Sequence, residues 1–287
     1  RPAGDYAAAT ARFAQVQASE GDQLVPDCRS RLLTNGAPTA EVYVLYHGLT
    51  NCPRQMVELA DALHATGANV LVLRAPGHGE RGRAAALGVA SAEAFRDDAD
   101  TSIDIAAGLG DHVTAVGLSL GGLLATWSAL ERPEVQRAVI IAPAYDLGGF
   151  PAIVTYAFPN LFSRLPNIAI PSNGQPLGDH AFPETPTYAV AEMLRLGRYV
   201  RAKAAAHPPV GKQVSFVIND ADTTISNAAA LEVAEEWQRA GVDVRIVRIP
   251  ASTGLPHDLI DMAQPVKRPD LVYPLILALA EGREPPG

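Results

Sequence analysis

The sequence predicts an α/β protein with a mostly parallel central sheet, helices on both faces of that sheet, and a small inserted cap. Short apolar runs alternate with longer segments of helical periodicity along most of the chain. The apolar runs are nearly continuous, which is typical of strands buried on both faces of a parallel sheet. The length of 287 residues, 48% of them hydrophobic, suits one large domain or a domain with an insertion.

In the first half of the chain, predicted strands and predicted helices follow one another in turn. Pro53 in a first turn and Gly67 after a last turn bound the first helix, and Ser91 is a suitable N-cap for the second. The expected strands are 42–46, 70–73, 113–118 and 138–142, and the expected helices are 53–66, 91–107 and 120–130. This order predicts parallel strands joined by helical crossovers.

The alternation breaks over residues 145–209, which are rich in proline, aromatic residues and glycine apart from a helical stretch at 188–206. It resumes with strands at 214–218 and 244–249, a helix at 226–240 and a final apolar helix at 271–280. An insertion in a parallel sheet usually sits above the carboxyl ends of the strands, where ligands bind. We therefore expect residues 1–144 and 210–287 to form the core and 145–209 to form a cap; the alternative is an excursion packed on the domain edge.

Composition limits the classes of function. The formal net charge of −8, spread along the chain, argues against nucleic acid as the main partner. No apolar run approaches the roughly 20 residues that a membrane-spanning helix needs, and two cysteines with seven scattered histidines do not suggest a metal site. The chain begins at Arg1, as after removal of a signal peptide or trimming, and we favour a secreted or envelope location over a cytoplasmic one.

Cys28 and Cys52 are the two cysteines of the chain. If the N-terminal segment lies beside the loop after the first strand, a disulfide between them would close a loop of about 24 residues. Chain entropy gives such a bond a stabilising value of roughly 3 kcal/mol. The sequence predicts this disulfide, with two buried free thiols as the alternative.

The segment Gly117-Leu118-Ser119-Leu120-Gly121 joins an apolar strand to an apolar helix. A serine on such a sharp turn has its hydroxyl lifted clear of the backbone, and the small residues two positions away let the chain bend tightly. The helix that starts there directs free N–H groups toward the same place. Ser119 is therefore the candidate nucleophile; the alternative is an ordinary glycine-rich turn.

A serine nucleophile needs a base, and the base needs an orienting group. In this architecture the acid and then the histidine follow the serine on later strand-end loops. The predicted strand at 214–218 runs into a loop with two carboxylates, of which Asp222 is the expected acid and Asp220 the alternative. The last predicted strand leads to His257, which we expect to be the base.

The loop after the first predicted strand begins with His47 and Gly48. The tetrahedral intermediate needs backbone donors, and we expect the N–H groups of Leu49 and Leu120 to form this oxyanion hole. His47 itself is expected to brace the loop. The glycine-rich segment 74–80 is expected to be architectural.

The motifs described above resemble the α/β-hydrolase superfamily, and most closely its bacterial carboxylesterase and monoacylglycerol-lipase-like branch. The matching segments are His47–Thr50, Pro76–Gly79, Gly117–Gly122, Asp222 and His257–Asp258. The resemblance covers most of the chain from about residue 40 onward except the cap. It implies an acyl-enzyme formed on Ser119, activated by His257 and braced by Asp222, with no metal and no organic cofactor.

We therefore expect a serine hydrolase acting on small-molecule carboxylic esters. The cap aromatics, which favour short to medium acyl or aromatic esters, are Tyr145, Phe150, Tyr156, Phe158, Phe162 and Phe182. Hydrolysis of amides or peptides, as in proline-type aminopeptidases, and C–C bond hydrolysis are alternatives with the same triad. An aminopeptidase needs acidic cap residues for the substrate amine, and Glu184 and Glu192 are the candidates. A non-catalytic binding module on the same fold is the remaining class.

Overall fold

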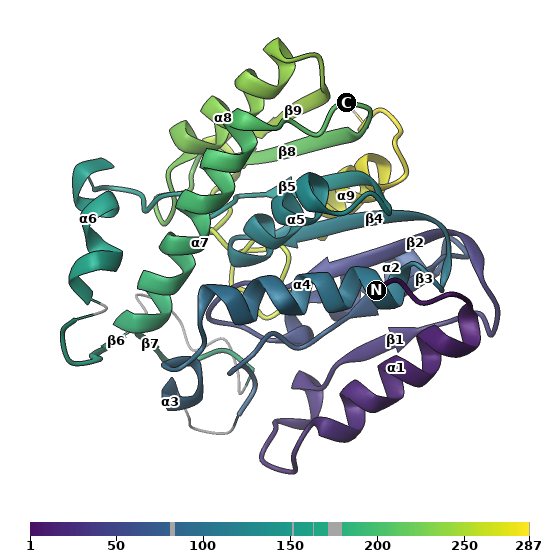
Figure 1. Cartoon of the computed structure of the whole chain (residues 1–287). Helices are drawn as coiled ribbons and strands as arrows, with labels where there is room; N and C mark the ends of the chain where they lie inside the picture. Colours follow the sequence, from purple (N-terminus) through teal and green to yellow (C-terminus); the bar gives the residue numbers. More distant parts are fainter. Residues whose placement is uncertain (81–83, 151, 163, 172–179, 287) are drawn as a thin grey trace.

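The computed structural model describes residues 1–80, 84–150, 152–162, 164–171 and 180–286. At its centre is a seven-stranded sheet in the order β1-β3-β2-β4-β5-β8-β9 (Figure 1). Neighbouring strands from β3 to β9 are parallel, and β1 pairs antiparallel with β3. The strands are β1 (Arg31–Leu33), β2 (Thr39–Tyr46), β3 (Asn69–Val72), β4 (Gly110–Leu118), β5 (Val135–Ile141), β8 (Gln213–Asn219) and β9 (Asp243–Ile249).

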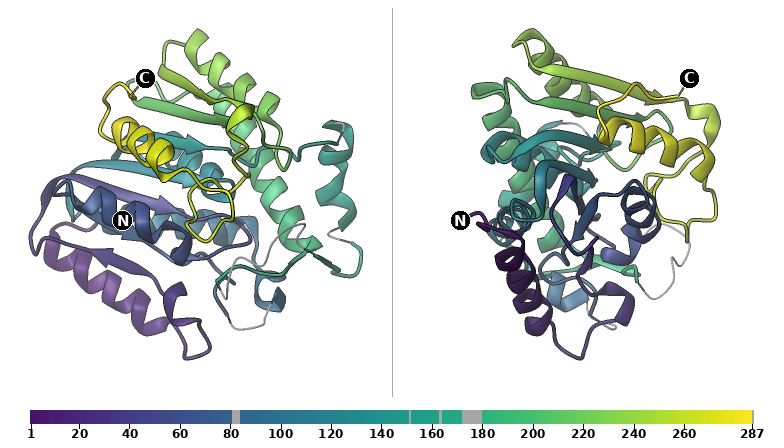
Figure 2. Two further views of the ribbon diagram at one scale, coloured as in Figure 1. Left: turned by 180° about the vertical axis from the view of Figure 1, so that it is seen from behind. Right: turned by 90° about the vertical axis from the view of Figure 1, so that its right-hand side faces the viewer.

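Helices cover both faces of the sheet (Figures 1 and 2). α4, α5, α7 and α8 form a connected layer on one face, and α2 and α9 contact each other on the other face. The helices of these layers are α2 (Val57–His64), α4 (Ala92–Ala106), α5 (Leu120–Glu131), α7 (Thr187–Ala206), α8 (Asn227–Arg239) and α9 (Pro269–Ala280). The predicted α/β class with a mostly parallel sheet is confirmed.

Each strand expected from the sequence is present, with bounds that differ by a few residues. The helix expected at 53–66 is divided into a 3-10 turn, η2 (Pro53–Met56), and α2, because Pro53 and the loop before it hold the first turn tight. Outside the predicted cap, one helix and one strand of the described chain were not expected. They are α1 (Tyr6–Ser19), which packs on α4, and the three-residue strand β1.

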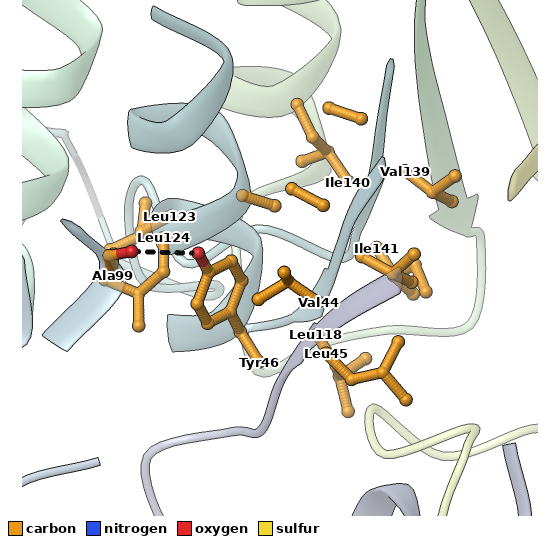
Figure 3. Close-up of a cluster of buried hydrophobic side chains, with 14 of the residues drawn as sticks. Val44, Leu45, Tyr46, Ala99, Leu118, Leu123, Leu124, Val139, Ile140 and Ile141 are labelled. Carbon is orange, nitrogen blue, oxygen red and sulfur yellow. Dashed lines mark hydrogen bonds between the residues drawn. The ribbon is translucent and has the colours of Figure 1, made fainter. Parts of the chain in front are cut away.

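The core lies between the sheet and these helices. Side chains on both faces of three adjacent central strands form the cluster drawn in Figure 3, together with residues of α4 and α5. The labelled residues are Val44, Leu45, Tyr46, Ala99, Leu118, Leu123, Leu124, Val139, Ile140 and Ile141. Burial of each large apolar side chain stabilises the fold by about 1.5–3 kcal/mol. The Tyr46 hydroxyl, buried among them, donates to the carbonyl of Ala99 at 3.3 Å.

The predicted disulfide is present. Cys28, at the end of the 3-10 turn η1 (Pro26–Cys28), is bonded to Cys52, which directly precedes η2. The bond therefore attaches the N-terminal segment to the loop that follows β2. Gly79 packs against this bond so closely that a Cβ at its position would lie 2.5 Å from the Cys28 Cβ.

The chain between β5 and β8 contains α6 (Ala152–Phe162), a two-stranded antiparallel pair of β6 (Ala169–Pro171) and β7 (Glu184–Pro186), and α7. α6 packs on α7 and stands away from the sheet in Figure 1, whereas α7 also packs on α4, α5 and α8. The short helix α3 (Ala84–Leu87) contacts β7. Phe182 N–H donates to the carbonyl of Thr50 at 2.8 Å, which ties this region to the loop after β2.

The sheet ends in β1 on one side and β9 on the other. Two arginines of β9 carry ion pairs with neighbouring loops. Arg245 pairs with Glu284 at 2.5 Å, and Arg248 pairs with Asp220 at 2.8 Å.

Candidate active site

Ser119 occupies the turn between β4 and α5. Its backbone has φ 61° and ψ −113°, a conformation that residues with a side chain rarely adopt. Strain of this kind persists where the surrounding structure holds it and is concentrated at functional sites. The Ser119 N–H donates to the carbonyl of Ile141 at 3.0 Å, and its carbonyl accepts from Ala144 N–H at 3.2 Å. The end of β5 and the residues just after it therefore hold the turn through both backbone groups of Ser119.

The two glycines that flank Ser119 are required by close approach of the backbone. A Cβ at Gly117 would lie 2.0 Å from the carbonyl oxygen of Gly121, and a Cβ at Gly121 would lie 2.0 Å from that of Tyr46. Both contacts are with backbone atoms that cannot move aside. The spacing of the motif is therefore explained by how tightly α5 leaves β4 and crosses the end of β2.

His257 and Asp222 form a direct pair. His257 Nδ1 lies 2.5 Å from Asp222 Oδ2, and Asp222 Oδ1 accepts from Thr224 N–H at 2.8 Å. The carboxylate is fully buried, while 19% of the imidazole is exposed. Because a carboxylate is an acceptor, this bond assigns the ring proton to Nδ1 and leaves Nε2 as the basic nitrogen.

Asp220, the alternative acid, lies elsewhere. Both of its short side-chain contacts are with the Arg248 guanidinium, at 2.8 and 3.0 Å, on the outer side of β9. Of the two carboxylates in the loop after β8, Asp222 is the one that meets the histidine.

The loops that carry the three predicted triad residues are held at the same end of the sheet. Asn219, the last residue of β8, donates from Nδ2 to the carbonyl oxygens of the two residues before His257, at 2.9 and 3.0 Å. A Cβ built on Gly48 would lie 3.8 Å from the Ser119 Cβ, which places Ser119 against the loop after β2. Within the described residues no hydrogen bond joins Ser119 Oγ to His257, so their direct contact stays a prediction.

Both predicted oxyanion donors are available. Leu120 is the first residue of α5, so its N–H has no partner inside the helix. The Leu49 N–H donates to no atom in the part of the chain that the structure describes. Among the described residues, no acceptor is bonded to either of these two N–H groups, one on the loop after β2 and one at the start of α5.

Two buried histidines hold the loop that carries Leu49. The His47 Nε2 accepts from Ala75 N–H at 3.1 Å, so its Nδ1 carries the proton and donates to the Gly48 carbonyl at 2.9 Å. His78 contacts the Leu49 carbonyl through Nε2 at 2.7 Å. Burial lowers the pKa of His78 to about 4 and that of His47 well below its usual value. Both rings are therefore neutral braces, as expected for His47.

A buried polar cluster beside His257 was not identified from the sequence. Gln55 bonds both Gly48 N–H and Asp258, Asn51 bonds Asp258 and Asp261, and His180 bonds Asp261 at 2.7 Å. Burial, and then the nearby Asp261 carboxylate, raise the pKa of Asp258. Burial also acts to raise the pKa of Asp261, but its bonds, that with His180 foremost, lower it. No motif spacing marks these residues, because their partners come from three separate segments.

The aromatic residues expected to form a pocket wall are dispersed in the structure. Tyr145 is fully buried and its hydroxyl lies 2.7 Å from Thr126 Oγ1 of α5, while Phe158 and Phe162 stack on each other within α6 with ring centroids 4.0 Å apart. Phe182 is buried, and its ring centroid lies 6.0 Å from that of His78. Two more are exposed, Phe150 and Tyr156.

The described residues contain no cluster of three or more histidine, cysteine or acidic side chains arranged for a metal ion. Among the helices described, none combines the length and apolarity that a membrane crossing requires.

Comparison with solved structures finds the same fold in several enzymes. The chain is similar to a structure from work on the metagenome-derived lipolytic enzymes LipS and LipT, with TM-score 0.71, 19% identity, and coverage of 91% of this chain and 100% of that one. It is similar to a soluble variant of monoglyceride lipase from Saccharomyces cerevisiae, with TM-score 0.68, 14% identity and coverage of 88% and 91%. Monoacylglycerol lipase from Paleococcus ferrophilus aligns with TM-score 0.61, 20% identity and coverage of 77% and 87%.

No curated protein matches the sequence significantly. A family model described as serine aminopeptidase, S33, matches residues 37–248, which is most of the chain and contains the serine turn and the loop of Asp222. The similar solved structures, at these low identities, establish the fold alone. The family model establishes the family, because it matches most of the sequence. The chain therefore belongs to the S33 serine aminopeptidase family of α/β-hydrolases.

Proposed function

We propose that this hydrolase cleaves carboxylic esters through a Ser119–His257–Asp222 triad and an acyl-enzyme intermediate. The observation that carries the proposal is the 2.5 Å bond between His257 Nδ1 and the buried Asp222, at the same end of the sheet as the strained Ser119 turn. A histidine oriented in this way presents a basic Nε2, which is what activates a serine hydroxyl.

The proposed reaction proceeds in two halves. Ser119 Oγ attacks the ester carbonyl while His257 Nε2 takes its proton, and the oxyanion is held by the N–H groups of Leu49 and Leu120. The protonated His257 then donates to the leaving alkoxide, which departs as the alcohol. Water, deprotonated by His257, attacks the acyl-enzyme and releases the carboxylic acid and Ser119. Asp222 stabilises the imidazolium in both halves.

The proposed cap, residues 145–209, would cover this site and select its substrate. The bond from Phe182 N–H to Thr50, one residue after Leu49, supports that position for the cap. Phe182 supplies an apolar surface beside His78, which favours uncharged acyl or aromatic esters of short to medium length. Similar solved structures include a monoacylglycerol lipase and an enzyme with bound ferulic acid, Est1E from Butyrivibrio proteoclasticus.

Peptide or amide hydrolysis is the second candidate, because the family model carries the name of an aminopeptidase. An aminopeptidase needs a free carboxylate near the site to bind the substrate amine. Glu192 does not fit this role, since its Oε2 accepts from Ala92 N–H at 2.9 Å and from Arg195 at 2.6 Å. Its carboxylate is therefore occupied by the fold. Glu184, the other candidate, is exposed on β7, so the aminopeptidase alternative now depends on that residue. We favour ester hydrolysis because Phe182 offers an apolar surface beside His78. C–C bond hydrolysis with the same triad has no observation in its favour.

A panel of p-nitrophenyl esters of increasing acyl length, beside peptide anilides, tests the proposal directly. Ser119→Ala should abolish ester hydrolysis, since loss of a triad serine costs about 10⁶-fold in kcat. Asp222→Asn should lower kcat by about 10⁴-fold, because it disturbs the histidine tautomer. Asp220→Asn is the matched control in the same loop and should retain activity. Ester hydrolysis that persists in Ser119→Ala, or anilides preferred over every ester, would overturn the proposal.

A further inference from the structure

One buried amide joins the loop of the predicted oxyanion donor to the loop of the predicted base. Gln55 lies on η2 and is 2% exposed. Its Oε1 accepts from Gly48 N–H at 2.7 Å, and its Nε2 donates to Asp258 Oδ2 at 2.7 Å. The two partners lie 210 positions apart in the sequence, since 258 − 48 = 210.

The chemistry of the two partners determines the orientation of this amide. An N–H group requires the amide oxygen, and a carboxylate requires the amide nitrogen. Both oxygens of Asp258 accept from N–H donors, as an ionised carboxylate does, so its bond with Gln55 is of the stronger, charge-assisted kind. Gln55 therefore holds both loops in one arrangement, and turning its amide over would break both bonds.

Each partner is adjacent to a group that the reaction uses. Gly48 precedes Leu49, and the carbonyl of Gly48 belongs to the same peptide unit as the Leu49 N–H. Asp258 directly follows His257. A shift of either partner relative to the other would change the distance between the oxyanion donor and the imidazole.

Neighbouring bonds hold Asp258 in place to receive Gln55. The N–H of Asp261 donates to Asp258 Oδ1 at 3.2 Å, and Asn51 Nδ2 donates to Oδ2 at 3.3 Å. Asn51 also donates to Asp261 at 3.1 Å, and its Oδ1 accepts from Cys52 N–H at 2.9 Å. The Asp258 side chain is therefore bonded both to its own loop, through Asp261, and to the segment after β2, through Asn51 and Gln55.

We propose that Gln55 is a positioning residue, which fixes the separation of the Leu49 N–H from His257 by bridging Gly48 and Asp258. The proposal rests on the proposed function. Gln55 reaches neither substrate nor the reacting atoms in this mechanism and acts through its two partners.

Positioning of this kind affects the transition state more than substrate binding. A misplacement of about 1 Å typically costs about 10²-fold in rate, and loss of one oxyanion donor costs about 10²–10³-fold. Loss of an interaction made only in the transition state lowers kcat while KM stays nearly unchanged. We therefore expect Gln55→Leu to lower kcat by about 10- to 100-fold with KM within about threefold of the wild-type value.

The decisive test reverses the polarity of the bridge. In Q55E/D258N the carboxylate at position 55 accepts from Gly48 N–H and from the new amide, so both bonds can form again. In Q55E, measured at pH 8, two carboxylates face each other, and in D258N the charge-assisted bond is lost. Asn69→Leu is the matched control, because Asn69 is a buried amide with hydrogen bonds at both ends, located at the start of β3.

Steady-state kinetics with p-nitrophenyl butyrate and thermal melting are measured for each variant. The proposal expects kcat at least about 10-fold below wild type in Q55L, Q55E and D258N, and recovery to within about threefold in Q55E/D258N. N69L should lower the melting temperature without lowering kcat. If Q55L does not fold, the comparison of Q55E with Q55E/D258N still tests whether Gln55 acts through Asp258.

Two results would overturn the positioning role. One is a kcat near wild type in Q55E and Q55L. The other is a double variant no more active than Q55E, which would mean that Gln55 and Asp258 act independently. Ser119→Ala is assayed beside them: if it keeps full activity, the proposed function has failed, and if it is inactive while the Gln55 variants are not, only the positioning role has failed.

Discussion

Removal of the Cys28–Cys52 disulfide should lower thermal stability by an amount that the loop size sets. The bond closes a loop with a sequence separation of 24. Chain entropy assigns such a loop about 3 kcal/mol through restriction of the unfolded state. With an unfolding entropy of about 2.1 cal/mol/K per residue, a chain of 287 residues should melt about 5 °C lower without the bond.

The assay is thermal melting by circular dichroism, with and without a phosphine reductant, on the wild type and on C28A/C52A. We expect the reduced wild type and the variant to melt at similar temperatures, about 5 °C below the oxidised protein. The variant in reductant is the control for effects of the reagent and should not shift. A decrease of less than about 1 °C in both would refute the reasoning, because it would mean that the bond constrains little in the unfolded chain.

Two more predictions concern the stability of the fold, one at low pH and one at the tightly packed Gly121. Because burial lowers the pKa of His78 to about 4, this imidazole takes up a proton between pH 6.5 and 4 in the unfolded chain but not in the folded one. His78 alone should therefore lower the unfolding free energy by about 3 kcal/mol over that range, and His47 should add to the fall. Urea titrations should show a weaker fall in His78→Gln, and an equal fall would contradict this. Gly121→Ala should cost at least about 1–3 kcal/mol, since its Cβ would lie 2.0 Å from the Tyr46 carbonyl oxygen. Gly21→Ala, which meets open space, is the melting control and should be near neutral.

Most strands and helices of the central sheet and its two layers could be predicted from local sequence patterns. Strands such as β4 and β8 contain largely apolar stretches, at 113–118 and 214–218, that can be recognised without knowing their neighbours in the sheet. The crossover helices between such strands follow from parallel pairing. The disulfide could also be predicted from the sequence, because two cysteines allow only one pairing. β1 could not be predicted, since three residues are too few to show a periodicity, and only pairing with β3 makes them a strand.

The residues of the candidate site also differ in whether the local sequence identifies them. Ser119 lies in a local motif, and Asp222 and His257 follow from the order of strand-end loops. Gln55 could not be found in this way, because nothing near it in the sequence distinguishes it from a solvated helix residue. Its role appears once folding brings Gly48 and Asp258 to either end of its amide.

The edges of the sheet have a consequence for self-association. A strand at an edge presents unpaired backbone groups that can recruit a second chain and extend the sheet without limit. β1 offers only three residues, too few for a stable new ladder. β9 is longer, but Arg245 and Arg248 place cationic side chains along it, each held by its acidic partner. We therefore expect this protein to resist edge-to-edge polymerisation in concentrated solution, because β1 is short and β9 carries charged side chains.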